Sequence, residues 1–193
     1  MTYILCAFEA EARTLIDSYR LKKEQTEPYT LFANEGYILI ISGMGQENGK
    51  ESSRYLLSNF PPRKDDIFIN LGVCAAKEAY TIGELLQVET LQNERSSYPL
   101  DIRDSSIKTV SCFSATIPLD KASSSDIAEM EALSVYEVIQ GSFRKEKISF
   151  LKIVSDNFRP FIPKKQFIIG LVHKNIKTIQ AHIKKLQGED HVR

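Results

Sequence analysis

Two carboxylates stand where a predicted helix begins and where a predicted strand ends. Glu131 lies in the acidic stretch Ala128–Ala132, directly before a helical pattern. Asp156 follows Ser155 at the end of the apolar, β-branched run 147–154, which predicts a buried strand. An acid at the carboxyl end of a strand would lie where open α/β sheets form their ligand crevice. Such a carboxylate must be solvated, paired or functional, because burying a lone charge is costly.

Two further acids, Glu9 and Glu11, open the helical pattern that follows the apolar run Tyr3–Phe8. The apolar run predicts a strand covered on both faces. Acids in a first helical turn are stabilised by the helix dipole, which would be a purely structural role. Alternatively, one of them faces the crevice at the end of the strand, and the residues alone leave both interpretations open.

A glycine-containing stretch, 42–49, follows a predicted hairpin with strands at 29–33 and 37–41 and precedes a predicted helix that ends near Ser58. Backbone N–H groups in such a stretch can meet an anion, although a plain tight turn would have the same composition. The sequence contains no full dinucleotide-binding or P-loop fingerprint.

The remaining pattern alternates predicted strands and helices. Strands are expected at 67–71 and 107–113, and a helix at 171–186 with apolar residues three and four positions apart. Gly188 is expected to end that helix. We therefore expect an α/β fold in which a mixed central sheet carries helices on both faces, as one domain over 1–193.

The composition excludes several classes of function. Twenty-five basic residues balance 25 acidic ones, so no overall charge favours nucleic acid or an anionic membrane. No apolar run reaches the roughly 20 residues of a membrane span, and no secretory signal is apparent. Cys6, Cys74 and Cys112 are widely spaced and odd in number, which favours reduced thiols in the cytoplasm over disulfides.

The three histidines do not suggest a metal site. His173 and His182 are nine residues apart, about half a turn out of phase on the predicted helix, and His191 lies beyond it. We expect no metal and no cofactor.

In order along the chain, Met130-Glu131-Ala132 and the strand that ends in Ser155-Asp156 resemble the nucleoside phosphorylase superfamily. Within it, the chain is most similar to the methylthioadenosine/S-adenosylhomocysteine nucleosidase branch. The run Gly72–Ala76 is similar to a glycine-rich motif of the family, with Val73 in place of the usual serine. The resemblance extends in pieces from Tyr3 to about Asn157 and implies an α/β/α sandwich that is commonly a homodimer.

This resemblance implies cleavage of an N-ribosidic bond in a purine nucleoside or a 5′-modified nucleoside. Glu11 would activate the attacking water and Asp156 would protonate the departing base, because general acid–base catalysis assists both events. Glu131 would accept hydrogen bonds from two ribose hydroxyls. Contacts with the substrate are expected from Met130, Glu131, Lys152, Ser155 and Phe113, and Lys152 stands where relatives have an arginine.

Two stretches depart from the family, 89–108 and 117–128. The first is expected to be polar and irregular where larger relatives have a helix, and the second is short and serine-rich where relatives hold an aromatic loop. Recognition of the base and of the 5′ group therefore cannot be carried over from the family. A mobile lid is expected at 157–163.

Water or phosphate as the nucleophile is a separate question. Phosphorylases of this superfamily bind phosphate with arginines from glycine-rich loops, and no arginine occurs between Lys64 and Glu94. Hydrolysis is therefore favoured over phosphorolysis. A non-catalytic nucleoside-binding module is the third possibility, because Val73 and the missing helix depart from the family.

Overall fold

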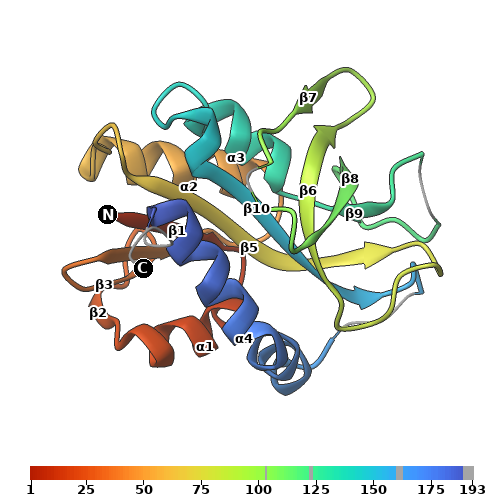
Figure 1. The fold of residues 1–193 in the computed structure, drawn as a ribbon, viewed down its shortest axis with the longest axis horizontal. Helices are drawn as coiled ribbons and strands as arrows, with labels where there is room; N and C mark the ends of the chain where they lie inside the picture. The colour runs from red at the N-terminus through yellow and green to blue at the C-terminus, as the bar shows by residue number, and fades with distance from the viewer. Residues whose placement is uncertain (103, 122–123, 160–162, 189–193) are drawn as a thin grey trace.

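The computed structural model describes residues 1–102, 104–121, 124–159 and 163–188. Its strands and helices alternate along the chain, as the sequence pattern predicts (Figure 1). They are β1 (Thr2–Cys6), α1 (Glu9–Tyr19), β2 (Lys22–Gln25), β3 (Thr30–Ala33), β4 (Tyr37–Ile41), α2 (Gln46–Asn59), β5 (Ile67–Ala76), β6 (Leu85–Gln92), β7 (Ser97–Pro99), β8 (Lys108–Ser114), β9 (Ile127–Glu129), α3 (Ala132–Ile139), the short 3₁₀ helix η1 (Lys145–Lys147), β10 (Ile148–Asp156) and α4 (Lys165–Gln187).

A single mixed sheet joins the strands of the described ranges, with α1 and α4 on one face and α2 and α3 on the other (Figure 1). Two buried apolar clusters fill the spaces between these layers. One contains Phe68 and Phe150 with α3, and the other contains Leu15, Ile179 and Ile183 from α1 and α4. The predicted α/β arrangement with helices on both faces is confirmed.

The sheet closes on itself in its second half. β5 pairs with β1, β9 and β10, while β6 pairs with β10 and β8, and β8 pairs with β9. The long strand β5 is therefore shared between an open part, in which β5, β1 and β4 are parallel, and a small closed ring of strands. The carboxyl ends of the parallel strands β1, β5 and β10 meet at one edge, which is where ligands bind in open α/β sheets.

Several predicted elements have different boundaries in the structure. β5 continues past Leu71 to Ala76, α4 begins at Lys165 rather than at Leu171, and Asp156 is the last residue of β10 rather than a residue beyond it. The stretch 89–108 was predicted to be polar, with turns and without a helix; its described residues contain no helix, but its first part is strand. There β6 runs to Gln92 and turns back through β7, since β7 pairs with β6.

Candidate active site

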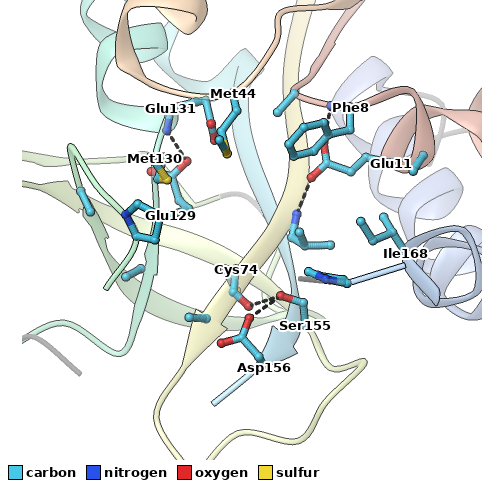
Figure 2. Close-up of a pocket in the computed structure, with 18 of the residues that line it drawn as sticks. Phe8, Glu11, Met44, Cys74, Glu129, Met130, Glu131, Ser155, Asp156 and Ile168 are labelled. Carbon is cyan, nitrogen blue, oxygen red and sulfur yellow. Dashed lines mark hydrogen bonds between the residues drawn. The ribbon is translucent and has the colours of Figure 1, made fainter. Parts of the chain in front are cut away.

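A pocket of about 1000 Å³ opens at the edge where β1, β5 and β10 end (Figure 2). Its walls come from segments that are far apart in the sequence. They include Ala7–Glu11 after β1, Val73–Ala75 of β5, Ala128–Glu131 before α3 and Ser155–Asp156 of β10. The topology therefore gathers at one place the acids that the sequence separates by more than a hundred residues.

Glu11 reaches this pocket from the first turn of α1 and is only 2% exposed. Its two carboxylate oxygens accept hydrogen bonds from the backbone N–H groups of Phe8 and Val73, both at 2.9 Å. The first bond caps the helix and the second ties α1 to β5. Burial raises the pKa of Glu11, while the backbone donors and the charge of Lys152 oppose that rise. Both sequence-based interpretations of this acid are thus compatible with its position.

Gly72 provides the space in which Glu11 and Lys152 approach one another. A Cβ at position 72 would lie 3.2 Å from Glu11 Oε1 and 3.5 Å from Lys152 Nζ. A glycine inside a strand often marks such a close approach. The missing side chain lets a carboxylate from one face and an ammonium from β10 come near the same point of β5.

Glu131 is the N-cap residue of α3, and its side chain faces the pocket (Figure 2). Its Oε1 accepts a 2.6 Å hydrogen bond from the backbone N–H of Gly45. Gly43 and Gly45 have φ values of +83° and +97°, which side chains on L residues rarely permit. The glycine-containing stretch therefore does meet an anion, and that anion is the protein's own Glu131.

Burial and the nearby negative charge of Glu129 raise the pKa of Glu131 to about 7, against the opposing charge of Lys152 and the Gly45 hydrogen bond. Glu131 therefore changes its charge near neutral pH. The ionised form only accepts hydrogen bonds, whereas the protonated form also donates one.

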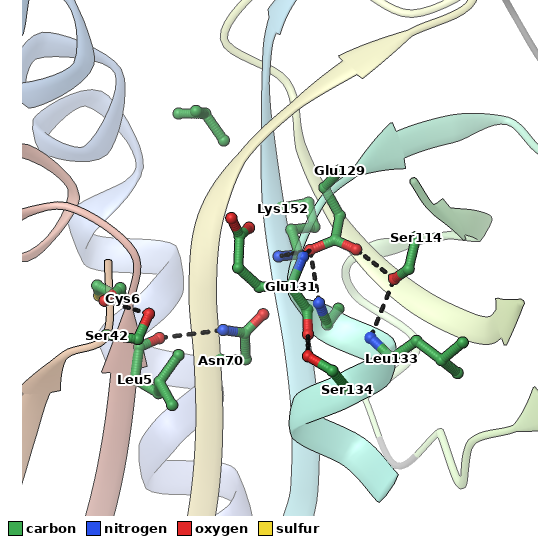
Figure 3. A network of polar contacts seen from close by, with 12 residues as sticks. Leu5, Cys6, Ser42, Asn70, Ser114, Glu129, Glu131, Leu133, Ser134 and Lys152 are labelled. Carbon is green, nitrogen blue, oxygen red and sulfur yellow. Dashed lines mark hydrogen bonds and ion pairs between the residues drawn. The ribbon is translucent and has the colours of Figure 1, made fainter. Parts of the chain in front are cut away.

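Glu129 is a site residue that the sequence reasoning missed. Its Oε2 forms a 2.9 Å ion pair with Lys152 Nζ, and both side chains are almost completely buried (Figure 3). Ser114 donates a second hydrogen bond to its Oε1. Burial alone would raise the pKa of Glu129, but the charge of Lys152 and these hydrogen bonds hold it below its ordinary value. The available signal was the acidic stretch itself, which carries an acid on each side of Met130.

Asp156 and Ser155 lie at an irregularity in the pairing of β10 with β5. Ser155 Oγ lies 3.1 Å from the carbonyl oxygen of Cys74 and 2.9 Å from Asp156 Oδ2. Asp156 Oδ1 accepts the backbone N–H of Phe158 at 3.0 Å. The irregularity thus directs both side chains to the end of β5, and Asp156 also stabilises the turn that follows it.

The pocket brings together five of the seven residues expected from the sequence, namely Glu11, Met130, Glu131, Ser155 and Asp156. Phe113 and Lys152 do not belong to its lining. Phe113 lies on β8 beside β6 and β9, and Lys152 lies on β10 behind the wall, paired with Glu129. Of these two, Lys152 keeps a connection to the site through that ion pair.

The predicted lid falls partly outside the described residues, because 160–162 are not among them. The first residue of the predicted lid, Asn157, is held in place by hydrogen bonds. Its side-chain amide donates to the carbonyl oxygens of Ala76, Lys77 and Tyr80. Arg159 and Pro163, on either side of the undescribed positions, line the pocket.

The described residues contain no group of three or more His, Cys, Asp and Glu side chains placed to hold a metal ion. His182 is buried and bonded to Asp104 and Ser149, and His191 lies outside the described residues. The cysteines at 6, 74 and 112 are buried and free. Within the described ranges, no helix has the length and apolar character that crossing a membrane requires.

No protein-family model matches the sequence, and a search of curated proteins finds no match. Solved structures do match. The 5′-methylthioadenosine/S-adenosylhomocysteine nucleosidase of Campylobacter jejuni is 16% identical, with 95% of this chain and 98% of that chain covered and a TM-score of 0.78. The Helicobacter pylori nucleosidase, solved with butyl-thio-DADMe-Immucillin-A, is 15% identical over 95% and 97% of the two chains, with a TM-score of 0.77.

The 5′-methylthioadenosine nucleosidase of Arabidopsis thaliana is 14% identical over 94% of this chain and 95% of that chain, with a TM-score of 0.75. At these identities the similarity establishes the fold. The chain has the fold of these nucleosidases over nearly its whole length, as the sequence resemblance implied.

Proposed function

We propose that this chain is a hydrolase that cleaves the N-ribosidic bond of a purine nucleoside, including nucleosides with a modified 5′ position. The observation that carries the proposal is that Glu11, Glu131 and Asp156 line one pocket at the carboxyl ends of the strands. Hydrolysis of this bond needs a base for water, a hold on the ribose and a proton for the departing base. The three carboxylates can divide these tasks.

In the proposed reaction, a water molecule attacks the anomeric carbon and its oxygen forms the new bond. Glu11 accepts a proton from that water, and the raised pKa of Glu11 strengthens it as a base. The bond between carbon and the ring nitrogen breaks, and its electron pair stays with the base. Asp156 delivers a proton to a ring nitrogen of the leaving purine, so the products are free ribose, or its 5′ derivative, and the base.

Glu131 binds the ribose by accepting hydrogen bonds from two neighbouring hydroxyl groups, and Met130 packs against the sugar. Ser155 holds Asp156 in place, since the two side chains lie within hydrogen-bonding distance. We place the positive charge of Lys152 behind the wall, where it balances Glu129.

The apolar rim of the pocket supports a substrate with an apolar 5′ substituent. Phe8, Met44 and Ile117 line the pocket and are exposed. The matched structures are of nucleosidases whose names specify 5′-methylthioadenosine, and one was solved with a butylthio compound. We propose nucleosides of that class as the first to test.

We also propose that the chain is a single domain over 1–193 and acts as a homodimer in the cytoplasm. The exposed apolar side chains at the rim support a second copy over the pocket mouth, because burying them would stabilise a dimer. The buried free cysteines support a reducing compartment.

A product assay over a panel of nucleosides, with and without phosphate, tests the function. We expect free ribose or its 5′ derivative at a rate that added phosphate does not change. Detection of a ribose 1-phosphate would instead identify a phosphorylase. Binding of nucleosides without any turnover would identify a binding module.

A further inference from the structure

Glu131 is both the N-cap residue of α3 and part of the pocket wall, and either place could use its side chain. It is the N-cap residue of α3, and an N-cap side chain usually accepts a backbone N–H of the first turn. In this helix the N-cap side chain makes no such bond and instead accepts the N–H of Gly45 at the pocket. The donors at the start of α3 must therefore find other acceptors, because a helix leaves its first four N–H groups unpaired.

Those acceptors come from neighbouring strands. Glu129 Oε2 accepts the backbone N–H groups of Glu131 at 3.0 Å and Ala132 at 2.8 Å. Ser114 Oγ accepts the N–H of Leu133 at 3.0 Å and donates to the other oxygen of Glu129 (Figure 3). Three consecutive donors of the first turn are thus bonded to side chains of β8 and β9.

The ammonium group of Lys152 stabilises the ionised form of Glu129, the carboxylate that caps α3. Glu129 Oε2 accepts from Lys152 Nζ as well as from the two backbone donors, so the carboxylate needs its charge to satisfy all three. Lys152 is 1% exposed, and its ammonium group compensates for the burial of that charge. β10 is thereby connected to the start of α3 through one ion pair.

We propose that Glu129 is a positioning residue for Glu131: with Ser114 and Lys152 it caps α3 in place of the N-cap side chain, which leaves the Glu131 carboxylate for the ligand. The part of this inference that concerns ligand rests on the proposed function. The capping part concerns the protein alone. The charged groups that face Glu131 are Glu129, Lys152 and Glu11, so the same arrangement also sets the pH at which Glu131 ionises.

Glu129→Gln is the direct test, since it keeps the shape and removes the charge. Amide hydrogen exchange should become about 10–100-fold faster at residues 131–133, because charge-assisted bonds are lost. The amide resonance of Gly45, which reports the bond to Glu131, should shift. Binding of a C-nucleoside such as formycin A, whose carbon–carbon link cannot be hydrolysed, should weaken about 100-fold if Glu131 moves by about 1 Å.

The pH dependence of that binding reports the charge of Glu129. Removing that charge lowers the pKa of Glu131, so the acid limb of binding should move to lower pH. The exchange at residues 131–133 separates positioning from this electrostatic effect, because only loss of the cap makes that exchange faster. Asp126→Asn is the matched control, because Asp126 also accepts a backbone N–H and a serine hydroxyl, both from Ser111, but lies outside the pocket lining.

If the single variant does not fold, Glu129→Gln combined with Lys152→Met leaves no unpaired charge and should give the same faster exchange at residues 131–133 and the same change at Gly45. Unchanged exchange at 131–133 in a folded variant would overturn the inference. Weaker binding with unchanged exchange would also overturn it, since Glu129 would then act by touching the ligand. If the wild type binds no nucleoside but exchange and the Gly45 resonance respond, the capping inference stands and the proposed function fails.

Discussion

Two polar networks with buried carboxylates lie in different parts of the described residues, and the first of them contributes Glu129 and Glu131 to the lining of the pocket. The first is the site network of Glu129, Lys152, Ser114 and Glu131. The second joins the start of β10 to α4 through the buried residues Ser149, His182 and Asp104, and the exposed Lys185 and Ser106 also bond to Asp104.

The second network has the order of a serine hydrolase triad. His182 Nε2 lies 2.8 Å from Ser149 Oγ, and His182 Nδ1 lies 2.9 Å from Asp104 Oδ2. Yet the exposures of these three side chains are 2% for Ser149, 1% for His182 and 3% for Asp104, and none of them lines the pocket. A nucleophile that no substrate can reach cannot react, so we interpret this network as a structural connection between α4 and the sheet.

The networks also differ in charge balance. Around Asp104, hydrogen bonds from Ser106, His182 and Lys185 outweigh burial and hold the pKa of the carboxyl below its ordinary value. At the pocket, Glu11, Glu129 and Glu131 all lie near the ammonium group of Lys152, and burial together with the charge of Glu129 raises the pKa of Glu131 to about 7. We therefore use buried acidic charge beside an open pocket, rather than hydrogen-bond geometry alone, to choose the candidate site over the second network.

The largest expected effect is at Asp156. Asp156→Asn should lower turnover by roughly 10²–10⁴-fold, because asparagine keeps the shape but cannot transfer a proton. Stability should fall by at most about 1 kcal/mol, since Asn can still accept the N–H of Phe158. Turnover and melting temperature measured on one preparation test both statements, and a fully active variant would end the catalytic assignment.

The next largest effect is expected at Glu131. Glu131→Gln should weaken ribosyl binding by about 1.5–3 kcal/mol through the loss of a charged acceptor. It should also stabilise the fold at alkaline pH. The pKa of Glu131 is raised to about 7 in the folded state, so wild-type stability is lost as pH rises toward and through 7. Calorimetric binding at pH 8 and melting curves at pH 5 and 8 test these changes, and wild-type affinity in the variant would refute the ribose role.

Much of the fold could be predicted because its helices and long strands have strong local periodicity. α1, α4 and the core of β10 each bury a regular apolar pattern, and local sequence shows that pattern. β2, with the sequence Lys-Lys-Glu-Gln, has no such pattern. It exists because it pairs with β3 at the edge of the sheet.

The site could be predicted only where a residue's position follows from its own element. Asp156 ends a strand and Glu131 precedes a helix, so both were expected at the edge of the sheet, and both line the pocket there. Glu129 was missed because its partners Ser114 and Lys152 lie 15 and 23 residues away, on strands that meet only in the folded sheet. Lys152 was expected beside the substrate, but the side chain is directed to Glu129 instead.

A smaller effect is expected from Ser149→Ala in the second network. Turnover should not change, because Ser149 is remote from the pocket lining. The free energy of unfolding should fall by about 1–3 kcal/mol, since His182 Nε2 loses its hydrogen-bond partner while buried. Urea unfolding and the product assay test the pair of outcomes. Lost turnover at unchanged stability would mean that the two networks are functionally linked.

The smallest expected effect is a difference in how pH changes the stability supplied by the two networks. Burial lowers the pKa of His182, although its bond to Asp104 opposes the shift and Lys185 adds to it. His182 therefore contributes stability that is present above its unfolded pKa of about 6.5 and is lost as pH falls below that value. Glu131 has the opposite sign, as its contribution is lost with rising pH. In a stability profile measured by urea unfolding between pH 5 and 8, His182→Gln should thus remove a loss of stability that occurs as pH falls below about 6.5. Glu131→Gln should remove a loss of stability that occurs as pH rises to about 7, and it should leave the profile above pH 7 flat. If the stability of His182→Gln instead falls more steeply than that of the wild type below pH 6.5, His182 is charged in the folded protein. The second network would then contain a charged pair rather than a neutral hydrogen bond.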